Sequence, residues 1–413
     1  MQMNSAWGVV AIAMAALMIT LGPTAYAFGL FVLPVSEEFG LGRASMNTGL
    51  IAFNFGMALS SPVIGRLIDR YPVRRVMAIC AVLFGGSLVL LGLSHNAVFS
   101  AFVLGVPLAA GAVGAGVLTG PALVARSFTA GPARAMAIAA IGISLGSIVI
   151  VPAVAILIQW VGWRTTLVIE GVVLGALLLA LSALAPQAMR CSSFDGEAAG
   201  TGRAGPVRAP KPVPLLKTVA FWQVAIGTAL GLGVLQTLLV SLVPIARETG
   251  FSVSEAGSLL SLFGGFALVG KLVLAWLANR MEMRVILASL FTAIGALCML
   301  LLLTEGSYAL LIMTALLGLV AGVSTPSYQA LLADLFGQAS FGSANGAAML
   351  VIACTGALLM RLGGEIFDRS ASYDAMFMVF AAISLVSTGL LVSLAAPASK
   401  VGQPAVPQAA EHG

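Results

Sequence analysis

The chain has 413 residues, of which 60% are hydrophobic and only 8% carry a charge. Average soluble proteins are about 45–50% apolar and about 25% charged, so this chain cannot cover a soluble fold of its length with polar surface. The composition excludes a soluble enzyme, a disordered chain and a disulfide-rich secreted scaffold. It indicates an integral membrane protein.

Twelve apolar segments follow one another along the chain. Each has roughly the 20 residues that a helix needs to cross the hydrocarbon core of a bilayer. The predicted spans are 7–34, 46–66, 76–94, 97–125, 134–158, 165–185, 218–245, 255–277, 285–304, 308–333, 342–363 and 374–395.

A polar stretch at 187–217 separates the sixth apolar segment from the seventh. It is rich in Gly, Pro, Ser and basic residues and has no apolar periodicity, which is typical of a solvated linker. The sequence therefore predicts an all-α integral membrane protein of twelve transmembrane helices in two six-helix halves, at 1–186 and 218–396. A cytoplasmic tail at 397–413 follows the second half.

The basic residues predict the orientation in the membrane. With the linker in the cytoplasm, fourteen of the 20 Lys and Arg residues fall on the cytoplasmic side and four on the outer side. Cytoplasmic loops are the ones that carry the excess of Lys and Arg. We therefore expect a multi-pass protein of the cell (inner) membrane with both termini in the cytoplasm, and the net charge of +5 needs no nucleic-acid partner.

The two halves repeat each other at an offset of about 210 positions. The segment 34–40 shares proline, glutamate and glycine with 244–250, and 67–74 shares leucine and two arginines with 277–284. Parallel repeats of six helices are a transporter architecture, with the substrate site near the midplane between the halves.

The segment between predicted spans two and three reads Gly-Arg-Leu-Ile-Asp-Arg-Tyr-Pro-Val-Arg-Arg at 65–75. Its Gly-x-Leu-x-Asp-Arg-x-x-x-Arg-Arg spacing resembles the loop signature of the major facilitator superfamily. The resemblance implies that this loop latches the inward side during alternating access. Asp69 then carries the latch with Arg70 and Arg74 as its partners, and Gly65 completes the gating motif.

Other segments are similar to the monocarboxylate porter and oxalate/formate exchanger branch of that superfamily, namely 7–10, 27–34, 37–44, 125–146, 162–164 and 367–369. The drug/proton antiporter branch has a Gly-Pro-Gly-Gly pattern late in span five, which 147–152 lacks. The resemblance implies a secondary active transporter of small organic anions, above all monocarboxylates, by proton-coupled symport or anion exchange. The alternative is a drug or metabolite efflux antiporter of the same superfamily.

Two basic residues fall inside predicted spans, where a charge costs about 2.5–3.5 kcal/mol on insertion scales. Lys271 stands where the resemblance implies a cation that faces the substrate carboxylate; a lysine extending to the cytoplasmic headgroups is the alternative. Arg361 is either a second anion ligand or the partner of Glu365, four residues on. Ala267 stands where many carboxylate porters have an aspartate, so their usual proton-coupling partner is missing.

Glu170 lies well inside a span of the first half, where it either carries a coupled proton or pairs with Arg164. The uncharged candidates for substrate contact include residues of spans one, four, seven and ten, which line the cavity in the family that the chain resembles. Hydrogen bonds between helices would explain any one of them equally well. These candidates are Tyr26, Thr119, Gln236, Tyr328 and, from span two, Asn54.

No constellation of catalytic groups is evident in the sequence. Its two histidines, His95 and His412, fall in a predicted loop and in the tail, and it contains no phosphate-binding Gly-x-x-x-x-Gly-Lys-Ser/Thr loop. We expect no enzyme activity, no cofactor and no metal. The expected partners of a monomer are the lipid bilayer, the organic anion, and protons or a counter-anion.

Overall fold

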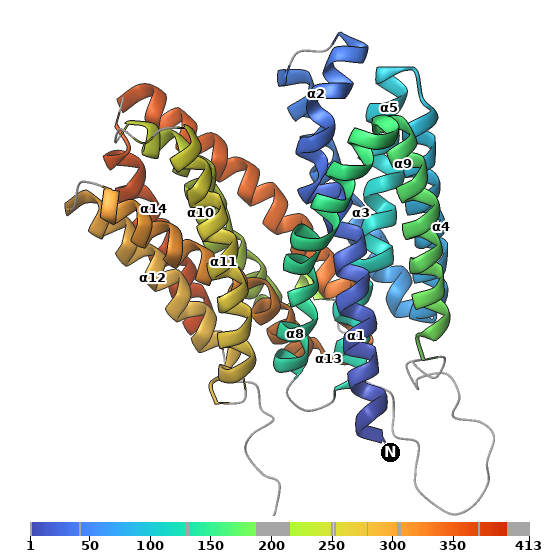
Figure 1. Cartoon of the computed structure of the whole chain (residues 1–413). Coiled ribbons are helices and arrows are strands. Elements are labelled where there is room, and N and C mark those ends of the chain that lie inside the picture. Colours follow the sequence, from blue (N-terminus) through green and yellow to red (C-terminus); the bar gives the residue numbers. More distant parts are fainter. Residues whose placement is uncertain are drawn as a thin grey trace, which may run out of the picture.

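The computed structural model of the chain describes residues 2–40, 43–128, 132–186, 215–248, 251, 253–278, 280–303, 307–370 and 372–394. These residues form helices and short connections and contain no β-strand (Figure 1). The predicted all-α fold is confirmed. The predicted tail lies outside the described residues, as does the predicted linker apart from its last turn, η5 (Leu215–Lys217).

The first half has several helices that continue into one another through π-helical turns, labelled η. The first predicted span consists of α1, η1 and α2, and the fourth runs from α5 to α7. In chain order the elements are α1 (Gln2–Leu21), η1 (Gly22–Tyr26), α2 (Phe28–Phe39), α3 (Arg43–Arg70), α4 (Val73–Leu93), α5 (Ala97–Val103), η2 (Leu104–Leu108), α6 (Ala109–Ala112), η3 (Val113–Val117), α7 (Thr119–Ser127), α8 (Pro132–Leu145), η4 (Gly146–Ile150) and α9 (Val151–Leu184).

The second half has longer uninterrupted helices. They are α10 (Val219–Glu248), α11 (Val253–Leu277), α12 (Met283–Leu303), α13 (Ser307–Ser370) and α14 (Asp374–Val392).

Two of the helical stretches each contain two membrane spans. Within the described residues, ten helical stretches are long and apolar enough to cross a membrane, and two of them, in α8–α9 and α13, are 53 and 61 residues long. Both contain a glycine with a left-handed backbone, Gly162 at φ 77° and Gly337 at φ 68°. L-residues with a side chain rarely adopt such φ values, so glycine is the residue that allows the chain to turn there. Both turns fall in predicted gaps between spans, and the twelve-helix prediction is confirmed.

Sequence features account for several of the local helix starts and irregular turns. Asn96 begins α5, and its side-chain oxygen accepts hydrogen bonds from the backbone N–H groups of Val98 and Phe99. Pro23 lies in η1 and Pro107 in η2. Proline lacks the N–H that continues an α-helix, and π-helical turns mark places where the regular ladder is interrupted.

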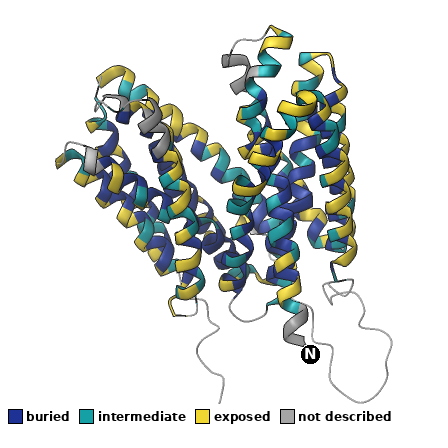
Figure 2. Ribbon diagram, in the orientation of Figure 1, coloured by how far each residue is buried: buried dark blue, intermediate teal, exposed yellow. Residues whose placement is uncertain are grey.

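The helices form two groups that converge at one end of the molecule and diverge at the other (Figure 1). We call the converging end, where the N-terminal helix α1 also begins, the closed end, and the other the open end. Each group buries apolar side chains in its interior and exposes others on its outer surface (Figure 2). Exposed apolar side chains such as those of Val98 and Leu303 suit helices that face lipid.

The two halves touch at the closed end through a small number of helix pairs. Helix α3 of the first half packs along α13 of the second, and α8 packs against both α11 and α13. The candidate functional residues with the clearest partners lie in these pairs.

Candidate functional site

Lys271 lies between the two halves, in the last two turns of α11. Its side chain is buried, with the residue only 6% exposed, and its Nζ donates a hydrogen bond of 2.7 Å to the Ser144 Oγ of α8. The interpretation of Lys271 as a lysine that extends to the headgroups is therefore wrong. The ammonium instead points across the interface between the halves.

Glycines on both helices set the position of this contact. A Cβ on Gly142 would lie 2.0 Å from the carbonyl oxygen of Met14, so α8 is pressed onto α1 at that point. Ser144 is two residues on, about 200° around the helix, and therefore faces away from α1. A Cβ on Gly270 would lie 2.4 Å from the carbonyl oxygen of Leu319, which fixes the backbone beside Lys271 against α13.

Asp69, near the end of α3, forms a second polar contact between the halves. Its carboxylate accepts hydrogen bonds from the backbone N–H groups of Gly342 at 3.0 Å and Ser343 at 2.7 Å, in α13. These donors lie near the start of the helical segment that follows Gly337, where the helix dipole favours a negative charge. The carboxylate of the predicted latch thus contacts the opposite half directly.

The cation beside Asp69 differs from the prediction. Arg126 of α7 lies 3.6 Å from the Asp69 carboxylate and also donates to the carbonyl oxygen of Ile68 at 2.8 Å. In the part of the chain that the structure describes, no ion pair joins Asp69 to Arg70 or Arg74. The expectation that these two arginines are its partners is therefore wrong. They follow Asp69 closely in sequence, but Arg70 is exposed and Arg74 is half-buried at the start of the next helix.

Small residues let α3 and α13 cross at very short distance beside Asp69. A Cβ on Gly65 would lie 2.1 Å from the carbonyl oxygen of Gly342, and a Cβ on Gly346 would lie 2.3 Å from the carbonyl oxygen of Ser61. Gly342 and Gly346 are four residues apart on α13, and two glycines at this spacing allow close contact between helices in membranes. Gly65 is therefore part of the surface that closes this end.

The uncharged candidates do not converge on one point. Tyr26, Asn54 and Gln236 are exposed, and the Asn54 amide donates to the Leu50 carbonyl of its own helix at 2.9 Å. The Gln236 side chain lies beside Gly356 of α13. Two further candidates, Thr119 and Tyr328, are buried in the bundles, at 0% and 4% exposure.

Two local pairs that the sequence left open as alternatives, Arg361 with Glu365 and Glu170 with Arg164, do not form within the ranges that the structure describes. Glu365 accepts hydrogen bonds from Arg369, at 2.7 Å and 3.0 Å, while Arg361 is exposed and has no ion pair among the residues described. Arg164 pairs with Glu38 instead of Glu170. Both carboxylate oxygens of Glu170 are buried without a hydrogen-bond partner in the described part of the molecule.

Arg164, Glu38 and Trp163 form a cluster at the open end that was not predicted. The Arg164 guanidinium donates to Glu38 at 2.8 Å and 2.9 Å, Trp163 Nε1 donates to the same carboxylate at 2.8 Å, and Arg164 also donates to the carbonyl oxygens of Gly92 and Ser94. The hydrogen bond from Arg164 is the main reason why the pKa of Glu38 lies below its usual value. The cluster ties the ends of three spans together within the first half.

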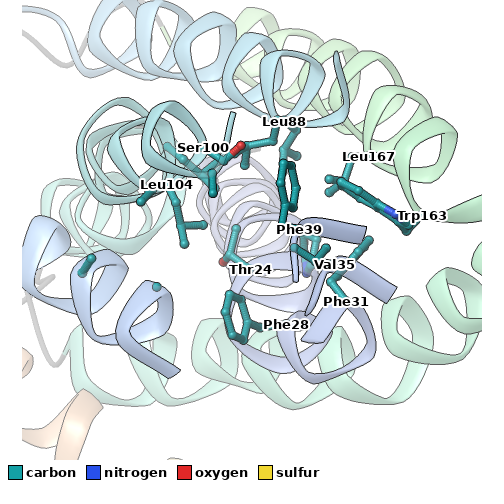
Figure 3. Close-up of a pocket in the computed structure, with 17 residues that line it drawn as sticks. Thr24, Phe28, Phe31, Val35, Phe39, Leu88, Ser100, Leu104, Trp163 and Leu167 are labelled. Carbon is teal, nitrogen blue, oxygen red and sulfur yellow. The ribbon is translucent and has the colours of Figure 1, made fainter. Parts of the chain in front are cut away.

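A cavity of about 210 Å³ lies beneath this cluster, and all of its lining residues belong to the first half (Figure 3). Its polar groups are already occupied, because the Thr24 hydroxyl donates to the Thr20 carbonyl and the Ser100 hydroxyl donates to Ser94. The remaining wall is apolar. The labelled lining side chains are Thr24, Phe28, Phe31, Val35, Phe39, Leu88, Ser100, Leu104, Trp163 and Leu167.

The described residues contain no group of three or more His, Cys, Asp or Glu side chains that could hold a metal ion. The polar groups that join the halves are instead an ammonium, a hydroxyl, a carboxylate and backbone N–H groups. Together they can hold the closed end together and attract a small anion.

The sequence matches the family profile described as "Major Facilitator Superfamily" over residues 7–245 and again over 224–411. The matches together cover nearly the whole chain, so it belongs to the major facilitator superfamily and is a multi-pass membrane transporter.

Similar proteins indicate to which branch of the superfamily the chain is related. Monocarboxylate transporter 11 of Mus musculus is 29% identical over 395 residues, which cover 89% of this chain and 83% of that protein. Monocarboxylate transporter 13 of Bos taurus is 27% identical over 399 residues, covering 91% and 87%. An uncharacterized MFS-type transporter of Bacillus subtilis (strain 168), YcxA, is 26% identical over 375 residues, 88% of each chain. The resemblance to the monocarboxylate porter branch is confirmed.

Solved structures share the fold. FucP, a major facilitator superfamily transporter in the outward conformation, superposes with a TM-score of 0.70 at 17% identity, covering 94% of this chain and 99% of that one. The human organic anion transporter MFSD10 (TETRAN) gives a TM-score of 0.70 at 16% identity with the same coverage. At these identities the likeness concerns the fold alone.

Proposed function

We propose that the protein is a secondary active transporter of small organic anions, above all monocarboxylates, and that Lys271 binds the anion. The observation that carries the proposal is a buried ammonium between the two halves whose partner, among the described residues, is a neutral hydroxyl. The names of the relatives, monocarboxylate transporters 11 and 13, support the same substrate class.

The chemistry of Lys271 suits a carboxylate. An ammonium has three N–H donors, and the Ser144 hydroxyl occupies one of them. A carboxylate oxygen is a stronger acceptor for an ionised donor than a hydroxyl, and its attraction grows in a medium of low dielectric constant. A small monoanion would therefore neutralise Lys271 and supply stronger acceptors for its N–H donors than a hydroxyl does.

The proposed orientation places the closed end in the cytoplasm. The connection between α3 and α4 lies beside the Asp69 contact, and it belongs to the loop that is rich in arginine. Since such loops stay on the cytoplasmic side, the open end faces outward in this conformation and both termini are cytoplasmic. Alternating access then requires the contacts at Asp69 and Lys271 to break when the closed end opens.

A binding screen tests the proposal. Purified protein in lipid nanodiscs would be heated with a panel of small monocarboxylates, with their uncharged amides and with amphipathic cations. A ligand that binds only the folded state raises the melting temperature, so we expect the carboxylates to raise it and the amides not to. Stabilisation by the amphipathic cations alone would contradict the proposal and favour the drug-efflux alternative.

Glu170 is the proposed carrier of a coupled proton, because it is buried and Arg164 is engaged elsewhere. Glu170→Gln should abolish carboxylate accumulation driven by a pH gradient while counterflow exchange continues, since exchange moves no net proton. Uptake into proteoliposomes with and without a pH gradient measures both. The control is Glu365→Gln, which removes a carboxylate from a surface ion pair. Unchanged gradient-driven accumulation in Glu170→Gln would remove Glu170 from the coupling mechanism and favour anion exchange.

A further inference from the structure

Side-chain hydrogen bonds between the halves occur at only two places in the described part of the chain. One is the crossing of α3 and α13, where Asp69 accepts from backbone N–H groups and the Ser61 hydroxyl approaches the Met349 sulfur at 3.8 Å. The other is the contact between Lys271 and Ser144, which joins α11 to α8. This second contact includes Lys271, the residue proposed to bind the substrate anion.

The two residues belong to rigidly opposed helices. Gly142 and Gly146 flank Ser144, and a Cβ on either would come within 3.0 Å of a backbone oxygen of α1, so Ser144 moves with the first half. Gly270 holds the backbone beside Lys271 against α13 in the same way. Any movement that separates α8 from α11 must therefore lengthen the 2.7 Å hydrogen bond.

Breaking this bond has a consequence for the ammonium. A buried charge that loses its hydrogen-bond partner is strongly unfavourable unless another group replaces that partner. A carboxylate bound to Lys271 is such a replacement, because it supplies both the acceptor and the opposite charge.

We propose that Ser144 is the partner of Lys271 in the empty transporter, and that the incoming carboxylate takes its place on the ammonium. The exchange releases α8 from α11 and allows the closed end to open, so Ser144 links occupancy of the site to the gate. The proposal deepens the proposed function and rests on it for the identity of the anion. Ser144 acts here as a positioning residue and remains on its own half when the anion moves with Lys271.

The first experiment needs no substrate. Spin labels at the exposed Arg134 and Met281 would report the distance between the closed ends of α8 and α11, in full-length protein with its native cysteines replaced by alanine. Loss of a charged hydrogen bond should raise the ratio of open to closed molecules by at least about tenfold in Ser144→Ala. Ser144→Thr keeps the hydroxyl and should resemble wild type.

The matched control is Ser147→Ala. Ser147 lies one turn further on, and its hydroxyl donates to the Ser144 carbonyl oxygen of the same helix at 2.8 Å, so its removal leaves the contact with Lys271 intact. A distance distribution of Ser144→Ala that matches wild type would overturn the proposal, whatever the protein binds.

The second experiment repeats the measurement with increasing concentrations of a monocarboxylate from the panel. Wild type should open as the carboxylate binds, and Ser144→Ala should bind it at least about threefold more tightly, because the competing acceptor is gone. Weaker binding by Ser144→Ala would mean that the hydroxyl contacts the anion directly, and it would overturn the exchange. A third outcome is that Ser144→Ala opens without substrate but the protein binds no carboxylate. The contact between Lys271 and Ser144 would then hold the closed end shut, while the replacement of Ser144 by a carboxylate and the proposed function would both be refuted.

Discussion

Lys271→Ala is expected to lower the affinity for a monocarboxylate by at least about tenfold, because a hydrogen bond to a charged group contributes about 1.5–3 kcal/mol and each 1.4 kcal/mol is a factor of ten. The side chain is buried between the halves, so solvent does not screen the interaction as it would at the surface. Lys271→Arg should keep part of the affinity, since the charge remains while the geometry changes.

Equilibrium binding of the carboxylate and of its uncharged amide would be measured for each variant. The amide should bind wild type weakly and should lose little in Lys271→Ala. Arg369→Ala removes a positive charge from an exposed surface pair and serves as the control for long-range electrostatics. Normal carboxylate transport by Lys271→Ala would falsify the assignment of Lys271 as the anion ligand.

Gly65→Ala should prevent the closed end from closing fully. Its Cβ would lie 2.1 Å from the carbonyl oxygen of Gly342, whereas real Cβ contacts are essentially never shorter than 3.0 Å, so α3 and α13 must move apart. Overpacking of this kind costs about 1–3 kcal/mol. The ratio of closed to open molecules should therefore fall by about five- to a hundredfold. The same separation weakens the hydrogen bonds that Asp69 accepts from Gly342 and Ser343.

Spin labels at the exposed Tyr71 and Ala339 would report this separation, and initial uptake rates would report its effect on transport. Gly346→Ala should act alike, because its Cβ meets the Ser61 carbonyl oxygen at 2.3 Å. Gly364→Ala lies on the same helix, has no atom within 4 Å of the added Cβ, and should leave both measurements unchanged. Identical distances in Gly65→Ala and Gly364→Ala would contradict the role given to this crossing.

The span architecture was predictable because hydrocarbon thickness restricts the length of apolar segments so strongly. The positions of the two turns inside the long helical stretches were also predictable, because Gly162 and Gly337 fall in the gaps between predicted spans. That Lys271 has a partner was also predictable, since a lone charge in an apolar helix must find one in space. Its role as an anion ligand stays a prediction.

The partners themselves were not predictable from neighbouring positions. Glu38 and Arg164 are 126 residues apart and meet because the ends of two spans lie side by side. Asp69 binds backbone N–H groups. Every residue other than proline has one, so residue types in the sequence do not indicate which N–H groups will bind a carboxylate. Ser144 is one of many small polar residues in apolar helices, and only its position opposite Lys271 distinguishes it.

The cavity in the first half leaves α2 space into which it could move. About 210 Å³ of space lies against α2, which joins α1 through the irregular turn η1, while the second half has no such π-helical turn among its described residues. A step that moves α2 onto α4 and α9 would eliminate this space without displacing a well-packed core. Hydrostatic pressure favours states with less internal void. Pressure should therefore favour an arrangement of the first half in which this space is filled.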